Sequence, residues 1–304
     1  MPRIVSLIAS ATEIVHALGQ FPNQVGRSHE CDFPPGVAAL PVCTKATIDI
    51  HADSREIDRA VKDRVRNALS VYDVYDDVLE RLQPTHIITQ TQCEVCAVSL
   101  RDVERSVASR LASKPKIISL TPNALADVWE DIQRVADSLD IAECGNKVIA
   151  SLKERMDAIA ERAGASHERS TVACIEWIEP LMAGGNWTPE LIDMAGGVNL
   201  FGEVGKHSGY ITWQELEQSD PDVIVISPCG FDVERTGQEM HWLADRPAWH
   251  GLRAVRQGRV YLADGNLYFN RPGPSLVETL EILAEMLHPA IFQATYEGAA
   301  WKKL

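Results

Sequence analysis

Short apolar runs alternate with longer amphipathic stretches along the whole chain. The apolar runs have the length and β-branched content of buried strands, and they lie at 4–8, 25–28, 86–90, 116–120, 171–178, 223–227 and 259–263. Helical periodicity fills the intervals between them, at 11–19, 54–82, 124–139, 188–195, 233–244 and 275–287, and directly after Cys96. This alternation predicts an α/β fold with parallel sheets.

The longest amphipathic stretch, residues 143–163, lies near the middle of the chain. Val148, Leu152, Met156 and Ile159 fall on one face of this stretch when it is drawn as a helix, and charged residues fill the other face. Such a helix is long enough to bridge two lobes. We therefore predict an N-terminal α/β lobe over residues 1–122, linker helices over 123–165 and a C-terminal α/β lobe over 166–304.

The two halves of the chain share one local pattern. In residues 81–89 and again in 218–226, the end of a helix is followed by a proline two residues before a β-branched run. The two prolines are Pro84 and Pro221. Two similar lobes are the simplest explanation of this repetition.

Candidate chemistry gathers where two of the N-terminal strands end. Cys93 and Cys96 follow the strand at 86–90 and precede a helix, so the helix dipole favours the thiolate form of these cysteines. A second polar cluster, with His29, Glu30 and Cys31, follows the strand at 25–28. Ligand crevices of open α/β sheets lie at the carboxyl ends of strands. We therefore expect both clusters to meet at one crevice.

Composition and charge narrow the classes of partner. The chain has 304 residues, 45% of them hydrophobic, which is enough for two cores, and its formal net charge of −14 argues against nucleic acid and anionic membranes as partners. The sequence contains no run of about 18 apolar residues, so it predicts no membrane span. The first strand begins almost at Met1, so the sequence as written predicts a cytoplasmic protein, or a periplasmic one if a signal peptide has been removed.

Several segments, in their order and spacing, carry a resemblance to a known family. They are Arg3-Ile4-Val5-Ser6-Leu7-Ile8-Ala9-Ser10-Ala11-Thr12-Glu13-Ile14, Cys31-Asp32-Phe33-Pro34-Pro35, Leu82-Gln83-Pro84, Ala195-Gly196-Gly197-Val198-Asn199, Asp220-Pro221-Asp222-Val223-Ile224, and Asp264-Gly265 with Arg271-Pro272-Gly273-Pro274. Together they resemble the helical-backbone (class III) substrate-binding proteins of bacterial uptake systems, most closely the cobalamin-binding branch. The similarity covers residues 3–289.

This resemblance implies two α/β lobes on one long helix, with little hinge closure and a ligand held in the cleft between the lobes. It also implies that aromatic side chains cover the ligand. Glu30 stands where the relatives carry an aromatic ring. The candidate ligand-binding residues are His29, Glu30, Trp177, Trp187, Asp264, Tyr268 and Phe269.

The resemblance also implies a transporter partner, because relatives present one acidic side chain per lobe to a membrane permease. The matching regions here hold Asp76 and Asp77 in the first lobe, and Gln214 and Glu215 in the second. An ABC permease is therefore a candidate partner, beside a small-molecule ligand.

Two functions follow as hypotheses. The first is a binding protein, rather than an enzyme, for a corrinoid or another metal-bearing small molecule. The alternative is a cytoplasmic metalloprotein or enzyme in which Cys31, Cys93, Cys96 and His29 bind zinc or an iron–sulfur cluster in the same cleft. Hydrolase, P-loop, dinucleotide-binding and zinc-protease signatures do not occur in the sequence.

Overall fold

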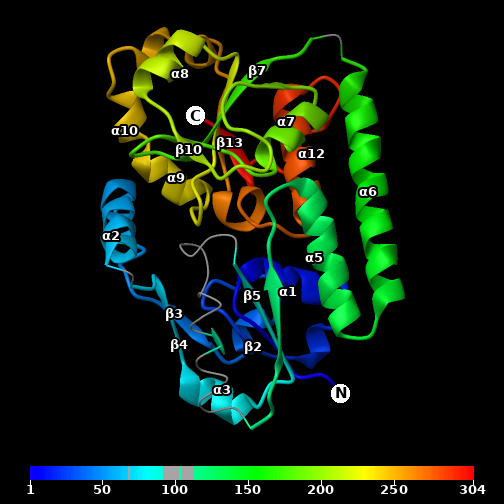
Figure 1. Cartoon of the computed structure of the whole chain (residues 1–304). Coiled ribbons are helices and arrows are strands. Elements are labelled where there is room, and N and C mark those ends of the chain that lie inside the picture. Colours follow the sequence, from blue (N-terminus) through cyan, green and yellow to red (C-terminus); the bar gives the residue numbers. More distant parts are fainter. Residues whose placement is uncertain (68, 92–102, 105–111, 167) are drawn as a thin grey trace.

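The computed structural model places two sheets one above the other, with a long helix running along the side of both (Figure 1). It describes residues 1–67, 69–91, 103–104, 112–166 and 168–304. Cys93 and Cys96 lie outside the described residues.

The first sheet contains four parallel strands in the order β2-β1-β5-β6. The strands are β1 (Ile4–Ser6), β2 (Gln24–Arg27), β5 (His86–Gln90) and β6 (Lys116–Leu120). The helices of this lobe are α1 (Ala9–Ala17), α2 (Ser54–Arg66), α3 (Asp76–Leu82) and α5 (Leu125–Ser138), with short 3-10 turns at Phe21–Asn23 and Val37–Ala39. Strands β1 and β5 lie at the centre of the sheet, and all of their Ile and Val residues are fully buried.

A small ribbon stands apart from this sheet. Strands β3 (Thr44–Ala46) and β4 (Tyr72–Val74) pair antiparallel, and α2 lies between them in the sequence. Asp53 caps α2 because its side chain accepts a hydrogen bond from the Glu56 backbone N–H at 2.8 Å. The periodicity at 54–82 predicted one helical region. The structure instead contains α2, β4 and α3, because residues 72–74 pair with β3.

The second sheet has a parallel centre and antiparallel edges. Strands β7 (Thr171–Trp177), β11 (Val223–Ile226) and β12 (Val260–Ala263) are parallel, and β9 (Val198–Asn199) pairs parallel with β7. The antiparallel strands are β8 (Met182–Ala183), β10 (Gly209–Tyr210) and β13 (Trp301–Lys303). The predicted parallel sheet is confirmed at the centre of this lobe. The antiparallel strands were not predicted, because they are too short to give a periodic signal.

The helices of the second lobe cover both faces of its sheet. They are α7 (Thr188–Met194), α8 (Trp213–Ser219), α9 (Val233–Glu239), α10 (His241–Ala244), α11 (Arg253–Arg256) and α12 (Leu276–Leu287), with a 3-10 turn at Trp249–Gly251 and a π-helical turn at Gly265–Phe269. The core on one face contains residues such as Trp249 and Ile226, and the core on the other contains Leu280 and Leu283.

The predicted long helix is confirmed as α6 (Ala142–Gly164), an unbroken helix of 23 residues. Met156, Ile159 and Ala163 are its buried apolar residues, and it packs against α5, α7 and α12. Figure 1 shows α6 beside both lobes. The lobe boundaries drawn from the sequence, at residues 122 and 166, stay a prediction.

The repeated pattern of the sequence corresponds to a repeated local structure. Gln83 is the cap residue directly after helix α3, and Asp220 is the cap residue directly after helix α8; both adopt the left-handed conformation, with φ of 41° and 38°. A proline follows each, and a buried parallel strand begins two residues after it. The same short sequence signal therefore starts a central strand in each lobe.

One apolar core passes from lobe to lobe along the side that carries α6. It includes Ile14 and Ile88 of the first lobe, and Leu191 and Leu280 of the second, all fully buried. Helices α5 and α6 contribute Ile132, Met156 and Ile159 to the same core. The two lobes are thus joined by continuous packing as well as by a helix.

Candidate functional site

A pocket of about 690 Å³ lies between the two lobes. The first lobe lines it with residues that follow β1 and β2 and with residues of α2, and the second lobe lines it with residues that follow β7, β11 and β12. These are the carboxyl ends of parallel strands, where α/β folds bind ligands. The predicted cleft between the lobes is therefore present, and its size is that of a site for a small molecule.

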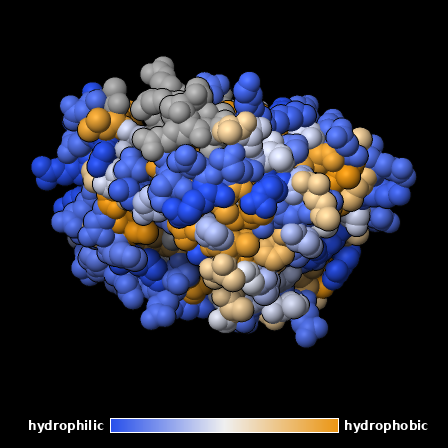
Figure 2. Space-filling model, turned by 90° about the horizontal axis from the view of Figure 1, so that it is seen from below, coloured by the Kyte–Doolittle hydropathy of each residue, from blue (hydrophilic) through white to orange (hydrophobic). Residues whose placement is uncertain are grey.

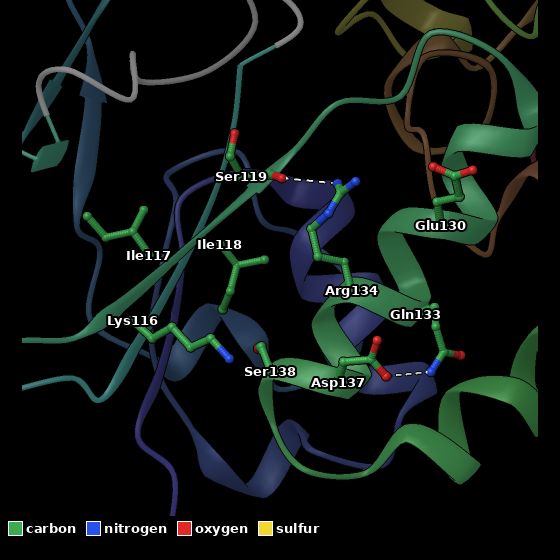
Figure 3. A pocket seen from close by; sticks show the side chains of 9 residues that line it. All are labelled: Lys116, Ile117, Ile118, Ser119, Glu130, Gln133, Arg134, Asp137 and Ser138. Carbon is green, nitrogen blue, oxygen red and sulfur yellow. Dashed lines mark hydrogen bonds between the residues drawn. The ribbon is translucent and has the colours of Figure 1, made fainter.

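A second hollow, of about 530 Å³, lies between strand β6 and helix α5 on the first lobe alone (Figure 3). Two of its long side chains already have partners: Gln133 donates to Asp137 at 2.7 Å, and Arg134 donates to the Ser119 carbonyl at 3.2 Å. None of the residues that line this hollow is aromatic. The pocket between the lobes, which has both aromatic and polar walls, is the candidate site.

His29 offers a free ring nitrogen in this pocket. Its Nδ1 forms a hydrogen bond with Thr44 Oγ1 at 2.8 Å, whereas Nε2 is buried and has no hydrogen-bond partner among the described residues. Burial, and then the positive charge of Arg27, lower the pKa of His29 below its usual value. A neutral imidazole whose second nitrogen is held by a hydroxyl is the form that binds metals.

Glu30 forms the wall beside His29. The hydroxyl of Tyr72 donates a hydrogen bond to Glu30 Oε1 at 2.7 Å, and the Tyr72 ring packs against His29 with ring centroids 5.3 Å apart. Burial raises the pKa of Glu30, and the Tyr72 hydrogen bond opposes this effect. His29, Glu30 and Tyr72 thus form one hydrogen-bonded and stacked group on the pocket wall.

A buried cation joins the lobes at the pocket. Arg271, which is 4% exposed, contacts Glu13 Oε1 at 3.3 Å and Asp32 Oδ1 at 2.7 Å. Asn266 donates to the other oxygen of Asp32 at 2.7 Å. Burial raises the pKa of Glu13 to about 7, against the lowering effect of Arg271. The first lobe supplies the carboxylates of this cluster and the second supplies the guanidinium.

Aromatic side chains of the second lobe form the opposite wall. Trp177 and Trp187 line the pocket together with Phe231, whose ring centroid lies 5.3 Å from that of Trp177. Trp187 is fixed in place because its Nε1 donates to the Phe269 carbonyl at 3.1 Å. Rings held in this way present a preformed surface to a flat or bulky ligand.

Residues 47–67, which we call the arm, close the pocket from the first lobe. The arm consists of α2 and the segment that leads into it. Its aliphatic side chains on the pocket are Ile48, Ile50, Ile57 and Val61. Figure 1 shows α2 reaching from the β3–β4 ribbon toward α9 and α10 of the second lobe.

The structure does not bring all the predicted ligand-binding residues to the pocket. His29, Glu30, Trp177 and Trp187 line it, but Asp264, Tyr268 and Phe269 do not. The Asp264 side chain instead caps the following turn, and Phe269 is buried in the core. Tyr268 packs against Tyr296, with ring centroids 6.0 Å apart.

The described part of the chain does not form the predicted metal centre. Cys31 is buried below the pocket wall, where its Sγ lies 3.1 Å from Thr12 Oγ1, and burial raises its pKa to about 11. Burial therefore favours the protonated thiol at neutral pH. No group of three or more His, Cys, Asp or Glu side chains suited to a metal occurs among the described residues. The other two predicted ligands, Cys93 and Cys96, lie outside them.

Sequence reasoning missed the arm, the pairing of Tyr72 with Glu30, and the cluster around Arg271. Glu13, Asp32 and Arg271 all occur in segments that carried the family resemblance, but nothing in the sequence shows that positions 13 and 271 meet. The amphipathic pattern of α2 was visible. Its apolar face reads as core packing until the fold places it on a pocket.

The fold and the pocket define a class of protein: two α/β lobes joined by one continuous helix, with a binding site between them. The chain belongs to the Periplasmic binding protein family, whose match covers residues 4–267.

Known relatives are similar over nearly the full chain. An uncharacterized ABC transporter substrate-binding lipoprotein of Bacillus subtilis is 21% identical over 96% of this chain and 81% of the relative. A vitamin B12-binding protein of Vibrio cholerae is 22% identical over 92% of this chain and 86% of the relative. The solved structure of a periplasmic heme-binding protein from Pseudomonas aeruginosa superposes with a TM-score of 0.74 at 18% identity, and the match covers 100% of this chain and 98% of that one.

The hydrophilic surface agrees with the high proportion of charged residues in the chain, 24%. Figure 2 shows a mostly hydrophilic face on which hydrophobic residues gather in small groups. Among the helices of the described residues, none is both long enough and apolar enough to cross a membrane.

Proposed function

We propose that this protein is the substrate-binding component of an ABC-type uptake system and that its ligand is a corrinoid. Membership of the Periplasmic binding protein family and the lipoprotein relative support the transport role. They also favour a location outside the cytoplasm over the cytoplasmic one expected from the opening residues. The vitamin B12-binding relative supports the corrinoid.

The observation that carries the proposal is the free Nε2 of His29 in a pocket with aromatic walls. A corrinoid has a broad ring with a central metal whose axial position takes an imidazole nitrogen. In the proposed complex His29 Nε2 binds the metal, while Thr44 keeps the other ring nitrogen in place. Trp177, Trp187 and Phe231 cover the ring of the ligand.

Aquocobalamin tests this proposal, because its visible bands shift when an imidazole replaces the bound water. We expect the wild-type protein to bind it and to cause this shift, and we expect His29→Ala to lose the shift and at least about tenfold in affinity, as for the loss of one good contact. His51→Ala is the matched control, since His51 also lines the pocket. Calorimetry measures affinity independently of colour.

Two results would contradict the proposal. Absence of binding at high micromolar aquocobalamin rules out the corrinoid, and binding of hemin instead would assign a porphyrin to the pocket. Binding with an unchanged shift in His29→Ala rules out His29 as the metal ligand.

A permease partner is part of the same proposal. Asp76 and Asp77 begin helix α3, and Glu215 lies in the first turn of α8, so the candidate docking acids lie at opposite ends of the molecule (Figure 1). Hydrogen bonds from Thr212 lower the pKa of Glu215, and one from Arg81 lowers that of Asp77. Both carboxylates are therefore charged at neutral pH, as contacts to permease arginines require.

A further inference from the structure

The arm is fastened to its own lobe at its base. Arg64 Nη2 donates to the Thr47 carbonyl at 2.8 Å and thereby ties the last turns of α2 to the start of the arm. The Thr47 backbone N–H donates to the Val71 carbonyl at 2.8 Å, next to the paired strands β3 and β4. The two ends of the arm are thus bonded to each other and to the two-stranded ribbon of β3 and β4.

The free side of the arm is attached to the second lobe by polar contacts, which we call the latch. Ser54 Oγ donates to Glu239 Oε2 at 2.9 Å, and Trp177 Nε1 donates to the Ser54 carbonyl at 3.0 Å. The hydroxyl of Tyr210 donates to Asp58 Oδ1 at 3.0 Å.

Two arginines add to the latch at its edge. Arg55 lies 3.3 Å from Glu179 and over the ring of Trp242, and Arg235 donates to the Ala52 carbonyl. The ion pair of the exposed Arg55 contributes little. The hydrogen bond between Ser54 and Glu239 is buried and contributes more, but water can replace each of these polar contacts once the arm has moved away.

The arm buries little apolar surface against the second lobe. Within α2 only Ser54 and Ile57 are buried. By contrast, the side that carries α6 joins the lobes by a continuous apolar core and by the buried pair of Glu13 and Arg271. Opening the lobes would break that core and bend α6, whereas detaching the arm would expose few apolar atoms.

We propose that the arm is the moving part of the binding site: it detaches from the second lobe to admit the ligand, and when it closes it presents Ile50, Ile57 and Val61 to an apolar face of that ligand. This inference rests on the proposed binding function. The lobes themselves keep their relative position throughout.

We call this opening and closing of the arm the gate. The rate at which aquocobalamin associates with the protein tests it. The double variant Ser54→Ala/Tyr210→Phe removes two hydroxyl groups, and with them two hydrogen bonds of the latch, and leaves the apolar core between the lobes unchanged. We expect its association rate to rise about five- to tenfold, because the open arm becomes more populated and binding requires that state. Arg155→Met is the matched control, since Arg155 joins α6 to Glu278 and Glu281 of α12 on the opposite side.

An unchanged association rate in the latch variant would overturn the proposal, and so would a similar increase in Arg155→Met, which would indicate opening of the lobes. Replacing Ile57 by Asn tests the apolar wall: we expect faster dissociation, by about tenfold, and equal dissociation rates would rule out the contact.

A second measurement needs no ligand and so separates failure of the gate from failure of the proposed function. Spin labels on unnatural amino acids at Glu56 and Gln238 span the latch, and labels at Lys116 and Gln257 span the lobes; all four positions are exposed. In the latch variant we expect the labels at Glu56 and Gln238 to show a second, longer distance beside the short one. The labels at Lys116 and Gln257 should keep a single, unchanged distance. A single short distance across the latch, or a change between the lobes, would refute the gate even if aquocobalamin does not bind.

Discussion

The two lobes are joined in different ways on the two sides of the pocket. On the side of α6, a single helix, a shared apolar core and the buried Arg271 hold the lobes together. On the side of the arm, the contacts are mostly polar: the buried hydrogen bond of Ser54 with Glu239, the exposed one of Tyr210 with Asp58, and the ion pair of the exposed Arg55. Apolar burial resists opening far more than replaceable polar contacts do. In our proposal the arm therefore controls access to the pocket, and the side that carries α6 keeps the shape of the pocket.

The largest expected effect concerns the continuity of α6. Ala158 is exposed near the middle of this helix, so Ala158→Pro changes the backbone without removing a buried side chain. Proline removes a hydrogen bond and clashes with the preceding turn, and we expect a loss of about 3 kcal/mol or more in the free energy of unfolding, measured with urea. Ala158→Gly, the control, should lose about 1 kcal/mol. Equal stability of the proline variant and the parent would contradict a structural role for this helix.

The next effect tests the buried cluster by pH. Because burial raises the folded-state pKa of Glu13 to about 7, from an ordinary value of 4.5, its protonated form favours folding. This contribution is complete below pH 4.5 and is lost as pH rises through 7. Wild-type protein should therefore lose up to about 3 kcal/mol of stability relative to Glu13→Gln over this range.

Urea midpoints of both proteins at several pH values measure this difference. Asp131, whose pKa burial raises to about 6, is common to both proteins and cancels in the comparison. Parallel stability curves for the two proteins would show that Glu13 does not titrate in this range.

The smallest effect on stability concerns the latch. Arg55→Ala removes an exposed ion pair with Glu179 and the contact with Trp242, and we expect a change in global stability below about 1 kcal/mol. Local opening should nevertheless increase. Trypsin should therefore cut the arm at Arg59 and Lys62 several-fold faster in the variant than in the parent, as mass spectrometry of the fragments can measure.

The same digestion supplies its own control, because cuts in α6 at Lys153 report global opening. A uniform rise at both places would mean that the whole protein is loosened, and the distinction between the two sides of the pocket would then fail.

Much of the fold could be predicted because its signals are local. The strands at 86–90 and 116–120 lie where their apolar runs place them, and the helix predicted at 143–163 is Ala142–Gly164. Buried parallel strands are continuous apolar runs, and a helix against a core carries a periodic face, so both patterns are visible in a single sequence. The pattern in which a helix end is followed by a proline and then a strand was also visible, because it depends only on neighbouring residues.

Part of the site was also predictable, since polar residues after parallel strands meet at one edge of a sheet. His29 and Glu30, which follow β2, line the pocket for this reason. Trp177 and Trp187 also line it, but they were candidates through the family resemblance. Tyr268 and Phe269 follow a strand of the second lobe in the same way, yet they pack away from the pocket. A side chain's direction after a strand depends on the turn that it enters, here a π-helical turn capped by Asp264.

The elements, their order and the helix that joins the halves could be predicted from the residues alone, because each depends on residues close together in the chain. Three features became visible only in the folded chain: Glu13 meets Arg271, Tyr72 pairs with Glu30, and the apolar face of α2 borders a pocket. These contacts join residues far apart in the sequence. Their existence depends on how the lobes pack, and local pattern carries no record of that packing.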